Sequence, residues 1–298
     1  RYPTVHSRSV LMRIGIHFPQ AEIPHDYMVI RDYLQRAETL GFSHINTPDH
    51  VLQTRTPVAD SPLAANYTTE FPHHEVMTLL SFAAGVTESL ELKTAILILP
   101  QRQAVLVAKQ AAQLDVLSGG RLQLGVGLGW NDPEFVSLDM NFNNRARRME
   151  EQIEVCRLLW TEQHVTYEGK WHKIDDAGLA PMPIQRPIPV WIGAFQPVAI
   201  SRAARIADGW QAMLPAPGEK SAAVFSDFQD QVKTAGRDPD SVGIEATIFS
   251  GKIDPETWAA QIQGWIDCGA TQILFRPQAE FSLIEQMVGE FAEVMKDF

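Results

Sequence analysis

Residues that could do acid–base chemistry stand directly after short apolar runs that are typical of buried strands. Asp49 and His50 follow one such run, residues 43–47. Because an imidazole titrates near neutral pH, His50 is a candidate general acid or base, and a carboxylate beside it could fix its tautomer. Asp49 is the expected carboxylate. The alternative is that Asp49 caps a loop and His50 is a hydrogen-bonded structural residue.

The elements that position these residues alternate along the chain. Eight β-branched or apolar runs are separated by segments of helical period, which is typical of a parallel sheet covered by helices. The runs start roughly 37 residues apart, a spacing that fits an α/β fold of the (β/α)₈ TIM-barrel class. The predicted strands are 12–17, 43–47, 92–99, 122–127, 189–193, 209–213, 242–247 and 271–275.

Two connections are longer than a barrel needs, so we expect a single domain over residues 12–298 with insertions after strands two and four. The segment 52–74 would lie on the catalytic face, where it could act as a lid. The segment 161–186 is expected to be loop. Residues 1–11 precede Met12, and we interpret them as a leader or as a remnant upstream of the natural start.

In such a barrel the active site lies at the carboxyl ends of the strands. His17, Trp130 and Arg276 end or follow predicted strands, and we expect them to contact a small-molecule substrate. A metal-dependent hydrolase barrel has two histidines, one residue apart, at the end of its first strand, whereas His17 is followed by Phe18 and Pro19. We interpret the run His73-His74-Glu75 as polar residues before a helix. No metal site is expected.

Glycines recur at two strand ends. Gly125, Gly127 and Gly129 lack the spacing of the dinucleotide-binding fingerprint, but they would let a planar ring approach the backbone, or would permit tight packing. The small-residue loop 193–195 precedes a helix and is a candidate phosphate site.

Charge and composition exclude several classes of protein. The 25 basic and 36 acidic residues give a net charge of −11, which argues against a protein that coats nucleic acid or binds anionic membranes. Two cysteines, Cys156 and Cys268, cannot build a disulfide framework, so a cytoplasmic location is expected. The basic cluster within 145–148 is either a solvated helix face or a clamp for an anionic tail.

A different class of enzyme also stays open at this point. A glycosidase needs two facing carboxylates, and Glu134 and Glu245 are the candidate pair. Glu245 lies in the middle of a predicted strand, so the sequence does not tell which way its side chain points.

Four motifs in order resemble the bacterial luciferase-like monooxygenase superfamily, and most closely its branch that uses the deazaflavin coenzyme F420. The resemblance runs from Met12 to about Phe298. The motifs are Pro48-Asp49-His50, the stretch 117–130 (LSGGRLQLGVGLGW), the stretch 189–193 (PVWIG) and the stretch 203–210 (AARIADGW).

The resemblance implies a homodimeric oxidoreductase with coenzyme F420, or alternatively FMN, at the barrel mouth. It implies that His50 exchanges a proton beside the ring and that a non-prolyl cis peptide lies near Ile96-Leu97. The residues that would contact the cofactor are Ile96, Leu97, Gly127, Gly129, Asn131, Gly193, Ala194 and Phe195.

The resemblance also leaves alternatives. An FMN-dependent monooxygenase and a non-catalytic flavin-binding relative are both consistent with the motifs. Leu128 stands where some deazaflavin dehydrogenases carry a glutamate and the luciferase an arginine. The stretch 51–53 lacks the tryptophan of the sugar-phosphate dehydrogenase relatives, which argues against their substrate.

Overall fold

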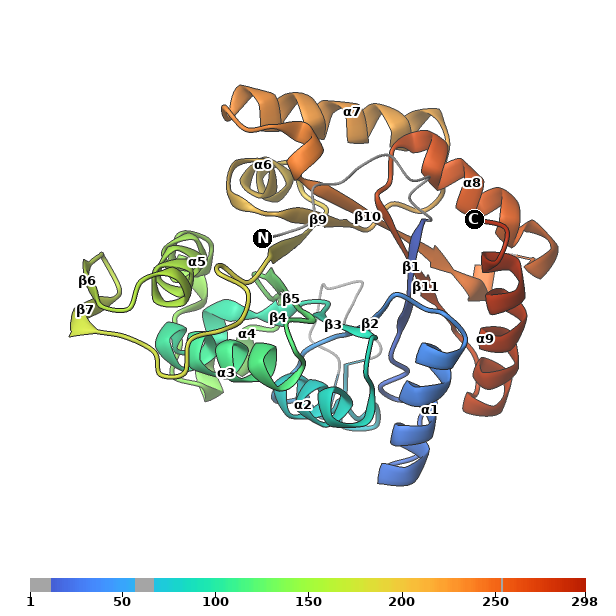
Figure 1. Ribbon diagram of the computed structural model, residues 1–298, viewed down its shortest axis with the longest axis horizontal. Coiled ribbons are helices and arrows are strands. Elements are labelled where there is room, and N and C mark those ends of the chain that lie inside the picture. Colours follow the sequence, from blue (N-terminus) through green and yellow to red (C-terminus); the bar gives the residue numbers. More distant parts are fainter. Residues whose placement is uncertain (1–11, 57–66, 253) are drawn as a thin grey trace.

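Eight parallel strand positions close into a barrel with helices around it (Figure 1). The computed structural model describes residues 12–56, 67–252 and 254–298, so the predicted leader over 1–11 lies outside them. The order is β3-β2-β1-β11-β10-β9-β8-β5, and pairing of β3 with β5 closes the barrel, which confirms the predicted fold class. The barrel strands are β1 (Arg13–His17), β2 (His44–Thr47), β3 (Glu91–Thr94) continued by β4 (Leu97–Ile98), β5 (Leu122–Gly127), β8 (Val190–Ala194), β9 (Gly209–Ala212), β10 (Gly243–Phe249) and β11 (Gln272–Arg276).

The helices pack apolar stripes against the barrel. In the first, Ile30, Tyr33, Leu34 and Ala37 are buried, and the Asp26 side chain accepts the Met28 N–H at 2.7 Å to cap the amino end. The α-helices are α1 (Tyr27–Thr39), α2 (Val76–Val86), α3 (Ala104–Leu117), α4 (Asp132–Ser137), α5 (Arg145–Thr161), α6 (Pro197–Ile206), α7 (Glu219–Thr234), α8 (Trp258–Cys268) and α9 (Phe281–Met295). Short 3₁₀ turns are η2 (Leu99–Gln101), η3 (Phe142–Asn144), η4 (Pro239–Ser241), η5 (Ser250–Lys252) and η6 (Pro255–Thr257).

The third barrel strand is not continuous over 92–99 as predicted. A non-prolyl cis peptide joins Ala95 to Ile96 and separates β3 from β4. This bond lies one residue before the position that the family resemblance implied. Ile96 therefore lies between the two strand segments and pairs with no residue of the neighbouring strands in the described part of the chain.

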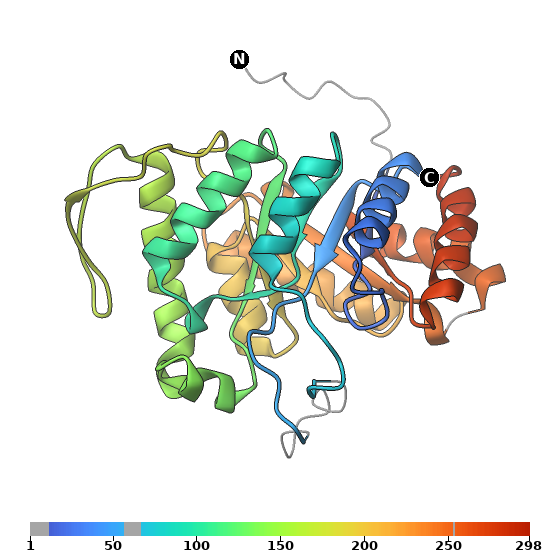
Figure 2. The same cartoon turned by 90° about the horizontal axis from the view of Figure 1, so that it is seen from below.

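The insertion after α5 contains an antiparallel hairpin where a loop was expected. Its strands are β6 (Val165–Glu168) and β7 (Lys173–Ala177), and it lies outside the ring of helices beside α5 (Figure 2). Glu151 on α5 holds the hairpin turn by accepting the backbone N–H groups of residues 170–172 at 2.8–2.9 Å. The pattern predicts no strand because only Val165 and Ile174 are buried.

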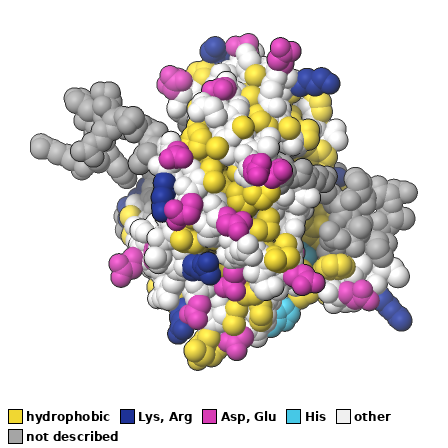
Figure 3. Space-filling view, turned by 90° about the vertical axis from the view of Figure 1, so that its right-hand side faces the viewer, with side chains coloured by type: hydrophobic (Ala, Val, Ile, Leu, Met, Phe, Trp, Pro, Cys, Tyr) yellow, Lys and Arg dark blue, Asp and Glu magenta, His cyan; other side chains and the backbone are white. Residues whose placement is uncertain are grey.

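The chain has more acidic than basic residues, and side chains of both signs are scattered among uncharged ones on the face in Figure 3. Among the described helices, none has the length and apolar content needed to cross a membrane.

Candidate active site at the carboxyl end of the barrel

His50 is held by a buried carboxylate that comes from 84 residues further along the chain. Its Nδ1 lies 2.8 Å from Oε2 of Glu134, which α4 carries directly after β5. The other carboxylate oxygen accepts the backbone N–H groups of Val51 and Leu52 at 2.9 and 3.1 Å, and the Asn131 amide donates to Oε2 at 3.0 Å. The carboxylate therefore fixes both the imidazole and the chain that follows it.

The ionisation of Glu134 sets the tautomer of the imidazole. Burial alone would raise the pKa of Glu134, but the hydrogen bonds from His50 and from two backbone N–H groups lower it on balance. An ionised carboxylate can only accept, so Nδ1 of His50 carries the hydrogen of this bond. The nitrogen left for proton exchange is Nε2.

Asp49, the carboxylate that the sequence suggested for His50, makes other contacts. Its Oδ1 accepts from Arg102 at 2.8 Å, and its Oδ2 accepts the Ile98 N–H at 2.9 Å. Burial raises the pKa of Asp49, and Arg102 opposes that shift. The expectation that Asp49 orients His50 is wrong, because Glu134 lies against Nδ1 of His50 while both Asp49 oxygens accept from other groups. Asp49 instead ties β2 to β4 and to the start of α3.

Three aromatic rings surround His50. Their centroids lie 4.3 Å (Tyr67), 5.3 Å (His73) and 5.6 Å (Trp130) from the His50 ring, and Tyr67 also stacks on His73 at 5.1 Å. Trp130 was predicted to lie here, whereas Tyr67 and His73 were missed. Tyr67 comes from the described end of the predicted lid segment, of which residues 57–66 are outside the described range.

His73 is a neutral imidazole in this cluster. Burial, followed by the field of His50, lowers its pKa to about 4. Its Nδ1 lies 3.0 Å from the Phe71 carbonyl, and since that oxygen can only accept, Nδ1 carries the proton. Nε2 of His73 is therefore a hydrogen-bond acceptor.

His17 and Arg276 end the neighbouring strands β1 and β11, so the barrel brings these two predicted residues together. Burial and then the positive charge of Arg276 lower the pKa of His17. Nδ1 of His17 is buried and has no hydrogen-bond partner among the described residues. An imidazole in this state is available to a ligand.

The glycines at the carboxyl ends of β5 and β8 make room for two isoleucine side chains. A Cβ added at Gly127 or Gly193 would come within 2.6 Å of Ile96, and one at Gly129 within 2.6 Å of Ile98. The expected open surface over these glycines is therefore filled, and tight packing is their observed role. Ile96 itself is only partly buried.

The remaining predicted cofactor residues divide into two groups. Leu97 is fully buried in the core. The Asn131 amide nitrogen donates to Glu134, whereas its Oδ1 is buried and has no partner among the described residues. Ala194 is buried too, with its carbonyl accepting from Trp210 at 2.9 Å. Phe195 is 59% exposed and directly precedes α6, whose first turn has no side-chain cap.

These features fit a planar heterocyclic cofactor. Several buried polar atoms at the strand ends have no partner among the described residues, and the edge of such a ring offers both donors and acceptors. The atoms are Nδ1 of His17, Oδ1 of Asn46, Oγ1 of Thr47, both amide atoms of Gln101 and Oε1 of Gln211. Ile96 offers an apolar surface for the ring face.

The glycosidase alternative loses its carboxylate pair. Glu245 lies in the barrel interior, where it accepts from Lys93 at 2.7 Å, from His44 at 3.0 Å and from Asn46 at 2.8 Å. Burial alone would raise its pKa, but Lys93 and His44 lower the pKa of Glu245 to about 2. Glu134 and Glu245 thus belong to separate hydrogen-bond networks.

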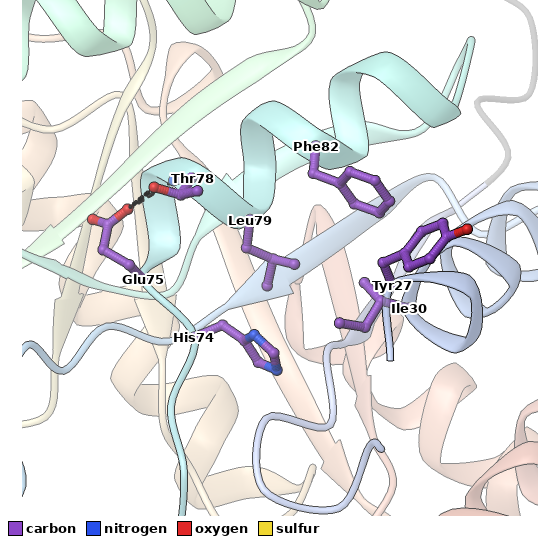
Figure 4. Close-up of a pocket in the computed structure, with 7 residues that line it drawn as sticks. All are labelled: Tyr27, Ile30, His74, Glu75, Thr78, Leu79 and Phe82. Carbon is purple, nitrogen blue, oxygen red and sulfur yellow. Dashed lines mark hydrogen bonds between the residues drawn. The ribbon is translucent and has the colours of Figure 1, made fainter. Parts of the chain in front are cut away.

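The run His73-His74-Glu75 also separates into different environments. His74 packs edge-on against Phe18 and lines a small cavity between α1 and α2 (Figure 4), while Glu75 caps α2 through the Thr78 N–H at 2.7 Å. Within the described ranges, no three His, Cys, Asp or Glu residues are grouped so as to hold a metal ion.

Comparisons with known proteins agree with this architecture. The chain is 13% identical to a long-chain alkane monooxygenase, with a TM-score of 0.79 over 97% of this chain and 91% of the other. It is 17% identical to an F420-dependent secondary alcohol dehydrogenase, with a TM-score of 0.77 over 95% of this chain and 98% of the other. At these identities the likeness concerns the fold alone.

Relatives in sequence include users of two cofactors. An F420-dependent glucose-6-phosphate dehydrogenase of Intrasporangium calvum is 32% identical over 60% of this chain and 52% of its own length. An FMNH₂-dependent dimethylsulfone monooxygenase of Pseudomonas putida is 34% identical over 45% of this chain and 38% of its own length.

The family itself is shown by broader matches. An uncharacterized protein of Mycobacterium tuberculosis is 31% identical over 249 residues, which cover 80% of this chain and 83% of that protein. The family model described as luciferase-like monooxygenase matches residues 11–281. This chain therefore belongs to the luciferase-like monooxygenase family of flavin- or deazaflavin-dependent oxidoreductases.

Proposed function

We propose that the protein is a coenzyme F420-dependent oxidoreductase that acts on a small organic substrate at the carboxyl end of the barrel. The observation that carries the proposal is the pair of His50 and buried Glu134 within a cluster of aromatic rings. The bound deazaflavin would supply hydride chemistry. The protein supplies orientation, an environment with little water and a proton-exchanging group.

His50 exchanges the proton through Nε2. Glu134 holds Nδ1, and it stabilises the imidazolium whenever the imidazole carries a second proton. Glu134 is a positioning residue, since its oxygens are occupied by His50, by Asn131 and by two backbone N–H groups. The rings of Tyr67 and Trp130 exclude water from the imidazole, which strengthens electrostatic interactions there.

The cofactor would lie across the strand ends. Ile96 would support one face of the ring, and the unpartnered polar atoms of Gln101 and Gln211 would meet its edge. The first turn of α6 near Phe195 would receive the phosphate. Pro197 has no N–H and the Ala199 N–H bonds to the Gln196 carbonyl at 2.9 Å, so Val198 would supply the N–H of this turn. His17 and Arg276, on adjacent strands, would contact the substrate.

The deazaflavin is preferred to FMN because the F420-dependent relative aligns over 60% of this chain and the FMNH₂-dependent one over 45%. An FMN-dependent monooxygenase is the second candidate. A non-catalytic flavin-binding protein is disfavoured, since it would have no use for a buried acid–base pair at the ring.

Equilibrium titrations with coenzyme F420 and with FMN at fixed salt test the proposal, with cofactor fluorescence as the signal. We expect tight binding of F420 and much weaker binding of FMN. Tighter binding of FMN than of F420 would instead support the second candidate, an FMN-dependent monooxygenase. Binding of neither would contradict the cofactor site as a whole.

A further inference from the structure

A second pocket shares no residue with the His50 cluster. It has a volume of about 440 Å³ and lies where the start of α3, one face of α5 and the tip of the β6–β7 hairpin meet. Its walls include Arg102, Met140, Arg148, Gln152 and Trp171. The composition is unusual for an acidic protein, because the described residues that line the pocket include two guanidinium groups and no carboxylate.

Arg148 is a buried cation without a counter-charge. It is 8% exposed, and no Asp or Glu of the described residues lies within 4 Å of its guanidinium. One Nη donates to the Pro100 carbonyl, while Nε has no partner within the part of the chain that the structure describes. Arg202, which is 7% exposed, instead has Glu150 at 2.7 Å. Since an unpaired buried charge is costly, Arg148 lacks an anion that Arg202 has.

Two further groups point to a bound molecule. The first turn of α3, which forms part of the wall, has no side-chain cap, so the positive end of a 14-residue helix is available. Gln152 is 1% exposed and lies one turn from Arg148. Its amide nitrogen donates to the Arg102 carbonyl, and its buried Oε1 has no partner among residues 12–56, 67–252 and 254–298.

The positive charge of Arg102 is already paired with carboxylates. It pairs with Asp49 at 2.8 Å and with Glu75 at 3.3 Å, so its charge is shared with the network at the end of β2. Arg148 is therefore the cation that an incoming anion would pair with. Met140 and Trp171 add apolar surface beside it.

We propose that this pocket binds a small organic anion. Its phosphate or carboxylate group pairs with Arg148 and the first turn of α3, and a hydroxyl or N–H of the ligand donates to Oε1 of Gln152. An apolar or aromatic part lies against Met140 and Trp171. This site is separate from the proposed cofactor and substrate site, and its occupancy does not depend on the cofactor.

Calorimetric titration of the full chain tests the proposal with four probes: phenyl phosphate, benzoate, inorganic phosphate and benzyl alcohol. We expect saturable binding of at least one aromatic anion, weaker binding of inorganic phosphate and none of the neutral alcohol. Comparing the affinity for phenyl phosphate with that for benzoate tells whether the site prefers a phosphate or a carboxylate group. Failure of both aromatic anions to bind would overturn the proposal.

Variants locate the site. Arg148→Met should weaken binding on the order of tenfold or more, which corresponds to the loss of one charged hydrogen-bonded contact. Gln152→Glu should do the same, because it places a carboxylate one helical turn from Arg148 and completes the ion pair internally. Arg202→Met is the matched control and should bind as the original protein does.

Three outcomes would contradict the site. If the Arg148→Met and Gln152→Glu variants bound the anion as tightly as the original protein does, the anion would not bind in this pocket. Loss of binding in His50→Asn would place it in the barrel mouth. A change of oligomeric mass in Arg148→Met, without anion binding by the original protein, would mean that a second chain supplies the counter-charge.

Discussion

Two histidine–glutamate pairs in this protein have similar geometry and different surroundings. His50 and Glu134 lie at the barrel mouth with 2.8 Å between them, and His172 and Glu151 lie at the hairpin turn with 2.9 Å between them. In each pair Nδ1 faces the carboxylate, which also accepts backbone N–H groups. The Glu134 side chain is fully buried, whereas that of Glu151 is 11% exposed.

The difference shows that a hydrogen-bonded imidazole is not by itself an acid–base site. Around His50, three rings pack closely, and buried polar atoms at the strand ends have no partner among the described residues. His172 lines the second pocket, and its carboxylate partner Glu151 holds the hairpin turn on α5 through backbone N–H groups. A third pair, His44 with Glu245, lies inside the barrel, where Lys93 completes an ion cluster. The same two residue types thus serve proton exchange, as we propose for His50, and structure.

The interior pair should give the largest effect on stability. Glu245→Gln removes the counter-charge of Lys93, whose side chain is fully buried. We expect a loss of about 3–5 kcal/mol in the free energy of unfolding, because an uncompensated charge remains in the core. Denaturant unfolding at neutral pH measures it. A decrease in the free energy of unfolding below about 1 kcal/mol would mean that water reaches the cluster of Lys93, His44 and Glu245.

The mouth pair should give the largest effect on turnover. His50→Asn removes the proton-exchanging nitrogen, and we expect turnover to fall about a hundredfold while cofactor affinity changes only a few-fold. Steady-state kinetics and the fluorescence titration measure the two quantities. Unchanged turnover would make His50 a structural residue like His172.

Removing the carboxylates compares the two pairs directly. Glu134→Gln should lower kcat on the order of tenfold with little change in KM, because the imidazole loses its orientation and its counter-charge. Glu151→Gln is the matched control: it should leave kcat unchanged and lower stability by about 1 kcal/mol through loosened turn contacts. Equal kinetics for the two variants would remove the distinction between the pairs.

The rings around His50 should give a smaller effect that depends on pH. Burial lowers the pKa of His73 to about 4, so between about pH 6.5 and 4 the unfolded chain binds a proton that the folded chain does not. Stability should therefore fall by about 1–2 kcal/mol as the pH drops through this window. His73→Gln should flatten this slope in thermal unfolding, and an unchanged slope would assign the effect to other groups.

The barrel could be predicted because its strands are short, apolar and regularly spaced. β5 occupies the predicted residues 122–127, and the other strand starts agree within a residue or two. The break at Ala95–Ile96 was foreseen only through the family resemblance, one residue too late. The β6–β7 hairpin was missed because it packs few side chains on the barrel, and so lacks an apolar pattern.

The site was harder to predict than the fold. His50 stood out by its position after a strand, but its partner Glu134 is 84 residues away, and only folding joins them. Asp49 was misleading because adjacency in sequence does not bring two side chains into contact, and its oxygens accept from Arg102 and Ile98 instead. Tyr67 and His73 carried no signal beyond their residue types. The homodimer and the cytoplasmic location stay predictions.

The packing of Ile96 between Gly127 and Gly193 has a consequence for how the proposed cofactor ring could be seated. One side chain fills the space above two glycines on neighbouring strands. Shortening it to valine or alanine would free that space while the strands and their hydrogen bonds stay as they are. The depth at which a ring lies in the barrel could thus change through a substitution at a single position, without remodelling any loop.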